Sequence, residues 1–321
     1  MNIKTSVKAL FRPVLTLAGF TYDSYRNFRF GGWRKNLHKQ NEVEYVLSKA
    51  YHSLEKSLSF PSNDIDRGWD AAYSLANLLV KTKGFDNNIH YLSALKVLQM
   101  FIEIKQNSIK LVGFKEKYDD LINTVVKVDW DVGAIQYFSN EKDFLSMQSP
   151  EDFFYSRFSA REFKDVIIDK QEIERTIKLA IKSPSACNRQ PWSVDVVQDK
   201  ATLNSILNIQ TGNSGFTNEI SNLFIVKSDI SAFISGNERY QHWIDGGMFS
   251  MSLVYALHSI GLASCCLNWS KMIRDDLELR KLLKLEPRQT IIMLIAFGYE
   301  KDEYKVCASP RKHLDSFITY R

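Results

Sequence analysis

The sequence predicts two folded parts, a small all-helical domain followed by an α+β domain, and three observations support this prediction. A chain of 321 residues is long for a single hydrophobic core. From Asn41 to about Val128, apolar residues recur at helical spacing without the alternation of a strand. Beyond residue 150, helical segments alternate with short runs of β-branched residues, which is typical of a sheet covered by helices. We therefore expect domains at residues 1–149 and 150–321.

Four helices are expected in the first part, each bounded by turn residues. The first has an apolar face running from Val43 to Leu54 and ends near Pro61. The second is stopped by Gly84. Residues 129–150 mix Gly, Ser, Asn and charged residues and are expected to link the two domains. The last three helices of this part are expected at residues 69–83, 89–104 and 114–128.

The second part is expected to begin with a capped helix and to contain three strands. Asp169 and Glu172 have the spacing of a capping box at a helix start. The stretch 246–270 has no charged residue and predicts a wholly buried helix, and a further helix is expected at 275–283. The inner face of the capped helix is expected to comprise Ile173, Ile177, Ala180 and Ile181. The strands are expected at residues 194–197, 223–226 and 291–297.

Residues 1–40 form a basic arm with interleaved aromatic residues. They carry eight Lys and Arg residues and one Asp, so the arm has a net charge of +7 and the remaining chain has −2. Seven aromatic rings lie among these charges, a mixture that suits an anionic membrane surface. Packing of the arm on its own domain or on a partner subunit is the simpler reading and is favoured. Nucleic acid is not an expected partner, because no reader module follows the arm.

Neither a signal peptide nor a membrane span is predicted. The apolar stretch at 9–20 is interrupted by Arg12 and Pro13, and the stretch 246–270 has too many polar side chains to face lipid on all sides. The four cysteines have no paired-motif spacing, so neither a disulfide framework nor a zinc site is suggested. We expect a cytoplasmic protein with reduced thiols, and peripheral membrane contact through residues 1–40 is the alternative.

One pair of residues in the helical part has the spacing of two metal ligands. His52 and Glu55 lie three residues apart and could face the same side of a helix. A lone pair of this kind is more often a hydrogen-bonded feature of the surface. No metal is therefore expected.

The segment from Arg157 to Phe163, RFSAREF, contains two arginines and a serine spaced two residues apart. In an extended segment this spacing places Arg157, Ser159 and Arg161 on one side. Arginine suits phosphate because its planar guanidinium donates two parallel hydrogen bonds. A solvated run of charges is the alternative for this segment taken alone.

The connection from Ser183 to Trp192, SPSACNRQPW, is richer in polar and rigid residues than a surface turn requires. Two prolines, two serines, an asparagine and a glutamine stand together, which favours a loop built to hold a planar polar ligand. A third basic stretch, from Ser309 to Lys312, contains Arg311.

These three segments together resemble the nitroreductase family of FMN-dependent oxidoreductases. In that family an Arg-x-Ser-x-Arg/Lys segment opens the domain, and a Pro-Ser-x-x-Asn-x-Gln-Pro-Trp loop follows the first long helix. A basic residue near the C-terminus completes the phosphate site. The stretch from Asp245 to Cys265 is similar to the family's central interface helix and the turn after it. The resemblance covers residues 150–321. The matching residues are Arg157, Ser159, Arg161, Pro184, Ser185, Asn188, Gln190, Pro191, Trp192 and Arg311.

The resemblance implies a nitroreductase-like sheet covered by helices, with a long buried interface helix and FMN between the subunits of a homodimer. It places Arg157, Ser159 and Arg311 around the FMN phosphate. Arg161 is implied to lie near flavin N1 and O2, where a positive charge stabilises the reduced form. The other implied contacts come from the loop of the neighbouring subunit and from the backbone facing the flavin N5 edge, namely Pro184, Ser185, Asn188, Gln190, Cys266, Leu267 and Asn268.

The implied function is that of an FMN-dependent oxidoreductase in which NADH or NADPH drives the reduction of a small planar acceptor. One alternative is a flavin-binding or degenerate adaptor at a membrane surface or in a polysaccharide-related complex. Another is a flavin enzyme that carries out dehydrogenation or dehalogenation. Phe158, Asn268 and Trp269 depart from the family pattern, which bears on substrate preference. Cys187 is not expected to be a nucleophile, because no hydrolase signature surrounds it.

Overall fold

The computed structural model groups the chain into two compact units. The sheet unit comprises residues 1–31 and 143–301, and the helical unit comprises residues 32–142 and 302–321. The structure describes residues 13–14, 16–18, 20–21, 24–25, 40–60, 64–85, 88–138, 149–186, 189–233 and 236–321.

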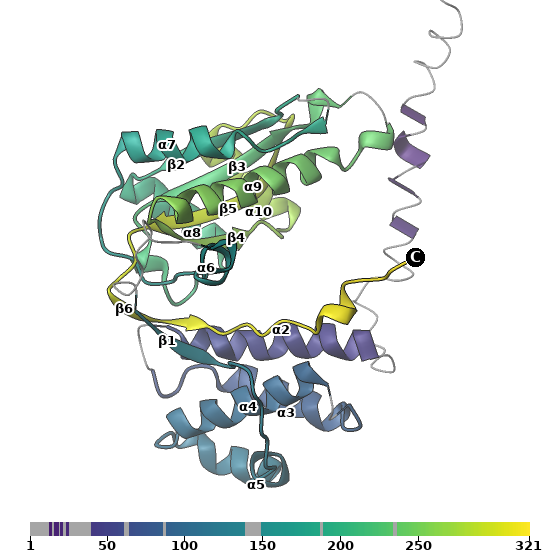
Figure 1. Ribbon diagram of the computed structural model, residues 1–321, viewed down its shortest axis with the longest axis vertical. Coiled ribbons are helices and arrows are strands. Elements are labelled where there is room, and N and C mark those ends of the chain that lie inside the picture. The colour runs from purple at the N-terminus through teal and green to yellow at the C-terminus, as the bar shows by residue number, and fades with distance from the viewer. Residues whose placement is uncertain are drawn as a thin grey trace, which may run out of the picture. The chain divides into compact units, whose positions relative to one another are not determined.

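The helical unit is built from helices around one apolar core (Figure 1). α2 spans Gln40–Leu58, α3 spans Trp69–Lys81 and α4 spans Ile89–Ile104. These bounds agree with the first three expected helices, because apolar residues at helical spacing give each helix a face to bury. The fully buried core side chains include Leu47, Leu54, Leu75, Leu79, Leu98 and Phe101.

The fourth helix of this unit begins and ends earlier than expected. α5 spans Lys110–Ile122, whereas the sequence predicted residues 114–128. Its apolar face was identified correctly, since Phe114 and Tyr118 are buried. Tyr118, however, has a φ of −130°, which kinks the helix. Val125 is 85% exposed, so no buried face extends the helix further.

A two-stranded antiparallel ribbon completes the helical unit. β1 (Ala134–Phe138) pairs with β6 (Glu303–Cys307). β1 lies inside the segment that was expected to be a linker, because its partner strand is distant in the sequence and no hairpin turn signals it. The pairing groups residues 302–321 with the helices, so the two units differ from the expected division between residues 149 and 150.

The sheet unit contains an antiparallel four-stranded sheet in the order β2-β3-β5-β4 (Figure 1). Its strands are β2 (Trp192–Val197), β3 (Leu223–Asp229), β4 (Ala263–Asn268) and β5 (Gln289–Gly298). β2, β3 and β5 confirm the three expected strands, whose β-branched and aromatic residues suit a sheet. β3 is buried from Leu223 to Ser228, so both faces of the sheet are covered at this strand.

Helices α7 (Lys170–Ala180) and α9 (Gln241–Ser259) pack together and share a core with the sheet (Figure 1). Gly246 allows α9 to approach β5 closely. A Cβ atom at this position would lie 2.6 Å from Cγ1 of Ile292, a separation that side chains do not tolerate. The contact between helix and sheet therefore depends on glycine at this position.

α9 is shorter and less buried than the sequence predicted. The stretch 246–270 was expected to be one wholly buried helix, but α9 ends at Ser259 and β4 follows. Gly261, with a φ of 83°, lies in the turn between them. The stretch lacks charged residues because α9 has apolar side chains on its exposed face as well as on its buried face. The exposed apolar side chains of α9 are Trp243, Ile244, Met248 and Met251.

One half of the predicted capping box is present at α7. Asp169 accepts a hydrogen bond from the backbone N–H of Glu172 at 2.9 Å. The Glu172 carboxylate accepts from the hydroxyl of Tyr299 at 2.7 and 2.9 Å, which ties α7 to the end of the sheet. Ile173 is buried as expected, but Ile181, just beyond the helix, is 49% exposed.

Shorter helices complete the described part of the sheet unit. α6 spans Pro150–Tyr155, α8 spans Lys200–Gln210 and α10 spans Ile273–Leu283. α8 and α10 contact each other. α10 agrees with the helix expected at 275–283, whereas the sequence analysis did not predict α6 and α8.

Few residues of the arm are described, and its eight basic residues all lie outside the described ranges. The ring of Phe20 packs edge-on against Tyr240 with ring centroids 6.3 Å apart. This contact agrees with an arm packed on its own domain, and membrane contact stays a prediction. Among the described helices, none combines the length and the apolar character needed to cross a bilayer.

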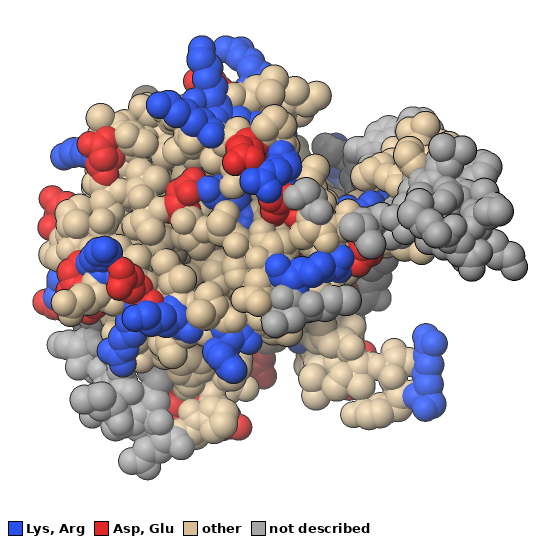
Figure 2. Space-filling model, turned by 90° about the horizontal axis from the view of Figure 1, so that it is seen from above, with Lys and Arg blue, Asp and Glu red and all other residues tan. Residues whose placement is uncertain are grey.

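Charge on the visible surface is mixed in sign. On the face shown in Figure 2, the basic and acidic side chains of the described residues are interspersed and do not form a large field of one sign. A continuous basic stripe, the usual electrostatic footprint of a nucleic-acid-binding protein, is not seen among the described residues on this face.

Candidate functional site

Residues 157–161, named the arginine segment, run in an extended conformation beside the edge strand β4. Ser159 forms a parallel bridge with Ser264, and the backbone N–H of Ala160 donates to the Ser264 carbonyl at 3.1 Å. Further along, the N–H of Lys164 donates to the Tyr299 carbonyl at 2.8 Å. The backbone therefore fixes the segment beside the strand that contains Cys266, Leu267 and Asn268.

The side chains of the arginine segment differ in burial. Arg157 and Ser159 are half-buried, whereas Arg161 is 5% exposed. One terminal nitrogen of Arg161 lies 3.4 Å from the carbonyl of Ser159, to which it donates. Arg157 and Ser159 are therefore more open to a ligand than Arg161. That all three lie on one side stays a prediction.

The positive charge of Arg157 reaches the neighbouring strand. Although Cys266 keeps an exposed surface, surrounding protein desolvates its thiol and raises its pKa to about 11, while the charge of Arg157 acts in the opposite direction. Leu267 is buried, and the carbonyl of Asn268 accepts a hydrogen bond from Gln210 at 3.0 Å. These residues belong to β4 and not to the expected turn, so the ladder with β5 uses part of their backbone.

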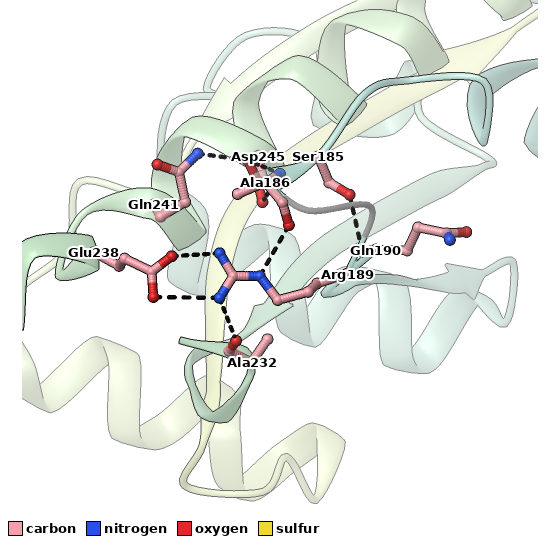
Figure 3. A network of polar contacts seen from close by, with 8 residues as sticks. All are labelled: Ser185, Ala186, Arg189, Gln190, Ala232, Glu238, Gln241 and Asp245. Atoms are coloured by element: carbon pink, nitrogen blue, oxygen red, sulfur yellow. Dashed lines mark hydrogen bonds and ion pairs between the residues drawn. The ribbon is translucent and has the colours of Figure 1, made fainter. Parts of the chain in front are cut away.

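Residues 183–192, named the proline loop, are anchored through a buried carboxylate (Figure 3). Asp245 of α9 is fully buried and accepts hydrogen bonds from the backbone N–H of Ala186 at 3.2 Å and from the Gln241 side chain at 2.8 Å. The loop backbone is thus held directly by the helix that covers the sheet.

An arginine clamp provides the second anchor of the proline loop (Figure 3). The guanidinium of Arg189 donates to both carboxylate oxygens of Glu238, at 2.5 and 3.3 Å, and to the carbonyl oxygens of Ala186 and Ala232, both at 2.9 Å. It also lies 4.7 Å from the centre of the Phe233 ring. A bidentate pair with further backbone contacts fixes both the position and the orientation of the arginine.

The loop has further internal constraints. Gln190 has a φ of 48°, and its N–H donates to the hydroxyl oxygen of Ser185 at 3.0 Å. Trp192 stacks on Phe249 of α9, with centroids 4.8 Å apart and an angle of 4° between the rings. This stacking packs the half-buried Trp192 against the core of the sheet unit. Asn188 and Cys187 lie outside the described residues, while Pro184 is exposed and Pro191 is buried.

The proline loop and the arginine segment lie at opposite edges of the sheet. The loop leads into β2 at one edge, and the arginine segment flanks β4 at the other. With about 4.8 Å between neighbouring strands, the four spacings from β2 to the arginine segment amount to about 19 Å. The backbones of the two segments in one copy are therefore far apart.

Arg311 belongs to the helical unit. Its guanidinium donates to the carbonyl of Ser309, and Lys312 forms an ion pair with Glu44 of α2. Burial and the neighbouring Glu55 charge raise the pKa of Tyr51 on α2 to about 12, while the hydrogen bond with Ser48 and the charge of Arg311 act in the opposite direction. The convergence of Arg311 and Arg157 on one phosphate stays a prediction.

The residues that hold the proline loop were not predicted from the sequence. Arg189 was treated as an unassigned position within the loop, and neither Glu238 nor Asp245 was chosen as a site residue. One signal was present, since Asp245 is the acidic residue at the border of the long uncharged stretch. No sequence signal connects Arg189 with Glu238, because that pair depends on how the loop and the 3-10 turn before α9 fold.

Comparison with known proteins finds a family match within the sheet unit. Residues 155–299 match the model of the nitroreductase family. The matched segment contains the arginine segment and the proline loop but not Arg311. A curated relative from Archaeoglobus fulgidus, named NADH dehydrogenase/NAD(P)H nitroreductase, is 28% identical over 150 residues, which are 46% of this chain and 84% of that protein.

Several solved structures resemble the chain over about half of its length. An FMN-dependent nitroreductase from Clostridium difficile is 23% identical and has a TM-score of 0.43, with 52% of this chain and 94% of that chain covered. A nitroreductase from Exiguobacterium sibiricum, solved in complex with FMN, is 17% identical with a TM-score of 0.47 and coverage of 56% and 98%. An NAD(P)H:FMN oxidoreductase from Staphylococcus epidermidis is 17% identical with a TM-score of 0.48 and coverage of 55% and 97%.

Proposed function

Because residues 155–299 form a nitroreductase-family domain, we propose that this protein is an FMN-dependent oxidoreductase in which NADH or NADPH drives reduction of a small planar acceptor. When bound, FMN would supply the hydride and electron transfer, and the protein would orient the flavin and adjust its electronics. The observation that carries the proposal is the backbone-fixed arginine segment beside β4, within the part of the chain that matches the family.

The donor set of the arginine segment suits the phosphate end of FMN. Arg157 and Ser159 are half-buried, so their polar atoms can reach a ligand, and the backbone bridge at Ser159 holds them without help from that ligand. A phosphate dianion is best bound by charge-assisted donors such as guanidinium groups. Arg311 is proposed to complete the phosphate site, and Arg161 to place positive charge near flavin N1 and O2.

The proline loop is proposed to serve the flavin of a second copy. The separation of about 19 Å between the backbones at the two sheet edges supports this arrangement, because it makes it harder for one copy alone to bring both segments to the same ring. The loop would offer Ser185, Asn188 and Gln190, with Pro184 and Pro191 limiting its freedom. A homodimer would also cover the apolar outer side chains of α9, which a monomer exposes.

We propose that the N5 edge of the flavin lies along the edge strand β4. Backbone groups of Cys266, Leu267 and Asn268 on the side of β4 away from β5 are the donors that the family resemblance assigns to this edge. The thiol of Cys266 has a raised pKa and would stay neutral at physiological pH, so it adds no negative charge beside the flavin.

An absorption spectrum of the purified protein is the first test. We expect the protein to be yellow, to release FMN on denaturation and to lose its flavin absorbance when NADH or NADPH is added without oxygen. Sedimentation analysis should show a dimer. Colourless protein that also fails to bind added FMN would contradict the proposal, and in that case pelleting with anionic vesicles would favour the adaptor.

A further inference from the structure

Three potential metal ligands meet in the helical unit, away from the segments assigned to the flavin. His52 and Glu55 lie one turn apart on α2, and Cys307 is the last residue of β6. One ligand atom from each residue lies within 4.8 Å of the others. The thiol comes from a strand that is distant in the sequence, so the spacing of His52 and Glu55 alone did not reveal the cluster.

The surroundings of the cluster hold its members in place. Nδ1 of His52 lies 3.1 Å from Oε2 of Glu55, and the other carboxylate oxygen of Glu55 accepts from the backbone N–H of Gly133 at 3.3 Å. The thiol of Cys307 lies 3.7 Å from the hydroxyl of Ser59. Glu55 is therefore not the surface residue that the sequence suggested, because it is fully buried.

The three groups have the chemistry of a zinc site. Zinc binds imidazole nitrogen, carboxylate oxygen and thiolate sulfur at about 2.0, 2.1 and 2.3 Å, so tetrahedral ligand atoms lie about 3.3–3.6 Å apart. The present separations need to close by only about 1 Å to reach this geometry. A softer thiolate beside an imidazole favours Zn²⁺ over Mg²⁺ or Ca²⁺, which prefer oxygen ligands.

We propose that His52, Glu55 and Cys307 bind a Zn²⁺ ion. The Glu55 and Cys307 side chains form the buried base of the site, while the His52 side chain is 43% exposed and gives the ion access from solvent. Three protein ligands leave a fourth position for water or for another ligand.

Binding of the ion would connect α2 to β6. In the structure, β6 is held to β1 by the backbone ladder, and Lys312 forms an ion pair with Glu44. A metal bond from Cys307 to two residues of α2 would add a cross-link between the helices and the last segment of the chain. The proposal does not depend on the flavin, so it can be tested independently of the proposed oxidoreductase activity.

The test uses the full-length protein after treatment with a chelator. Zn²⁺ alone is titrated in competition with a chromophoric zinc indicator, and Co²⁺ is added separately to record the thiolate-to-cobalt absorption as a difference spectrum. We expect one ion per chain and a thiolate-to-cobalt band. Thermal unfolding of the helical unit should move to higher temperature when zinc is bound.

Two variants and two controls identify the ligands. Cys307→Ser should abolish the cobalt band, and both Cys307→Ser and His52→Ala should weaken zinc binding by more than about 100-fold, the upper end of the loss seen when only an outer partner of a metal site is removed. The controls are Cys266→Ser, which removes the exposed thiol of the sheet unit, and His313→Ala, which removes another exposed histidine of the helical unit. Both should bind zinc like the unmodified chain.

Each possible result decides the proposal. Failure to bind one Zn²⁺ per chain, or unchanged affinity in His52→Ala and Cys307→Ser, overturns it. Equal losses in the variants and the controls also overturn it, because they indicate adventitious surface binding. His52 is half-exposed, so His52→Ala is expected to fold and settles the question even if Cys307→Ser does not.

Discussion

The arginine segment and the proline loop are both proposed to contact the flavin, but they are held in place by different interactions. Backbone contacts with Ser264 hold the arginine segment beside the sheet, and a second bridge, from Phe163 to Glu300, follows just after it. Side chains hold the proline loop, through the buried carboxylate of Asp245 and the pair between Arg189 and Glu238.

The difference predicts how each segment responds to substitution. Backbone pairing does not depend on which side chain is present, so the arginine segment can lose a ligand and keep its position. The proline loop depends on particular side chains, so a single replacement outside the loop can change its order. Substitutions in the arginine segment therefore test single flavin contacts, and substitutions around the proline loop test whether the loop is ordered before the flavin binds.

Arg157→Ala should have the largest effect on FMN binding. Loss of hydrogen bonds from a charged group costs about 1.5–3 kcal/mol, which corresponds to about 10- to 150-fold weaker binding. The unfolding curve and the circular dichroism spectrum should not change, because the segment is held by its backbone. Fluorescence titration with FMN measures the affinity, and Arg175→Ala, on the exposed side of α7, is the control. Equal affinity in both variants would remove Arg157 from the phosphate site.

Glu238 lies outside the proline loop, and Glu238→Gln should loosen the loop by weakening its pair with Arg189. Arg189 would keep its half-buried position but lose its charged partner, at a cost of about 1–2 kcal/mol. We expect up to about 30-fold faster hydrogen exchange at residues 184–191 and up to about 30-fold weaker FMN binding, because the loop must then be ordered by the ligand.

Glu286→Gln is the matched control for the loop. Glu286 forms an ion pair of the same 2.5 Å length with Arg288, but both side chains are at least half exposed. Exposed pairs contribute little, so no measurable change in loop exchange is expected. Faster exchange in this variant, or unchanged exchange in Glu238→Gln, would contradict the clamp.

Gly246→Ala tests the packing of α9 on the sheet, because α9 carries Asp245, which holds the proline loop. The added methyl would collide with Ile292, and after the gain in helix propensity a net loss of about 1–2 kcal/mol in the free energy of unfolding is expected. Displacement of α9 would also move Asp245, so exchange at Ala186 should increase. Gly247→Ala is the control, because no atom lies within 4 Å of its added Cβ atom. It should stabilise the chain by up to about 1 kcal/mol.

The smallest predicted effect lies in the helical unit and leaves both segments unchanged. Burial lowers the pKa of His90 from its usual 6.5. Its Nδ1 lies 3.0 Å from the hydroxyl of Tyr51, and its buried Nε2 has no hydrogen-bond partner among the residues that the structure describes. Just below pH 6.5, His90 therefore binds a proton in the unfolded chain but stays neutral in the folded chain. The free energy of unfolding is therefore unaffected by the titration of His90 above pH 6.5, and it falls as the pH drops from 6.5 toward the lowered pKa of His90 in the folded state.

Denaturant unfolding at several pH values measures this effect. The free energy of unfolding should fall by about 1.4 kcal/mol for each pH unit that the folded state remains unprotonated below pH 6.5. His90→Gln should remove that part of the pH dependence. An identical pH dependence in both proteins would rule out His90 as the titrating group, and exchange at the two flavin-assigned segments should be the same in both.

The sequence predicted most of the elements whose signal is local. α4 was found with its bounds, and β2, β3 and β5 were located from β-branched residues between turn signals. The arginine segment and the proline loop were recognised because residue types and spacing carry the family pattern. Their contact with the flavin stays a prediction.

Features that depend on distant partners were missed. β1 was taken for a linker because its partner β6 follows the entire sheet unit in the sequence. Cys307 was not connected with His52 for the same reason. β4 was not predicted as a strand because it contains no β-branched residue, and its place in the sheet comes from pairing with β5. The outer face of α9 was read as core because apolar residues cover both of its faces.

The ribbon of β1 and β6 has a consequence for how the protein is made. The helical unit is discontinuous in the sequence, and most of the sheet unit is inserted between its two strands. During synthesis β6 emerges only after the inserted segment, so the helices remain without their second strand until that segment has left the ribosome. A fragment ending before residue 302 would keep the flavin-assigned segments of the sheet unit but leave β1 as an unpaired edge, where another chain can add.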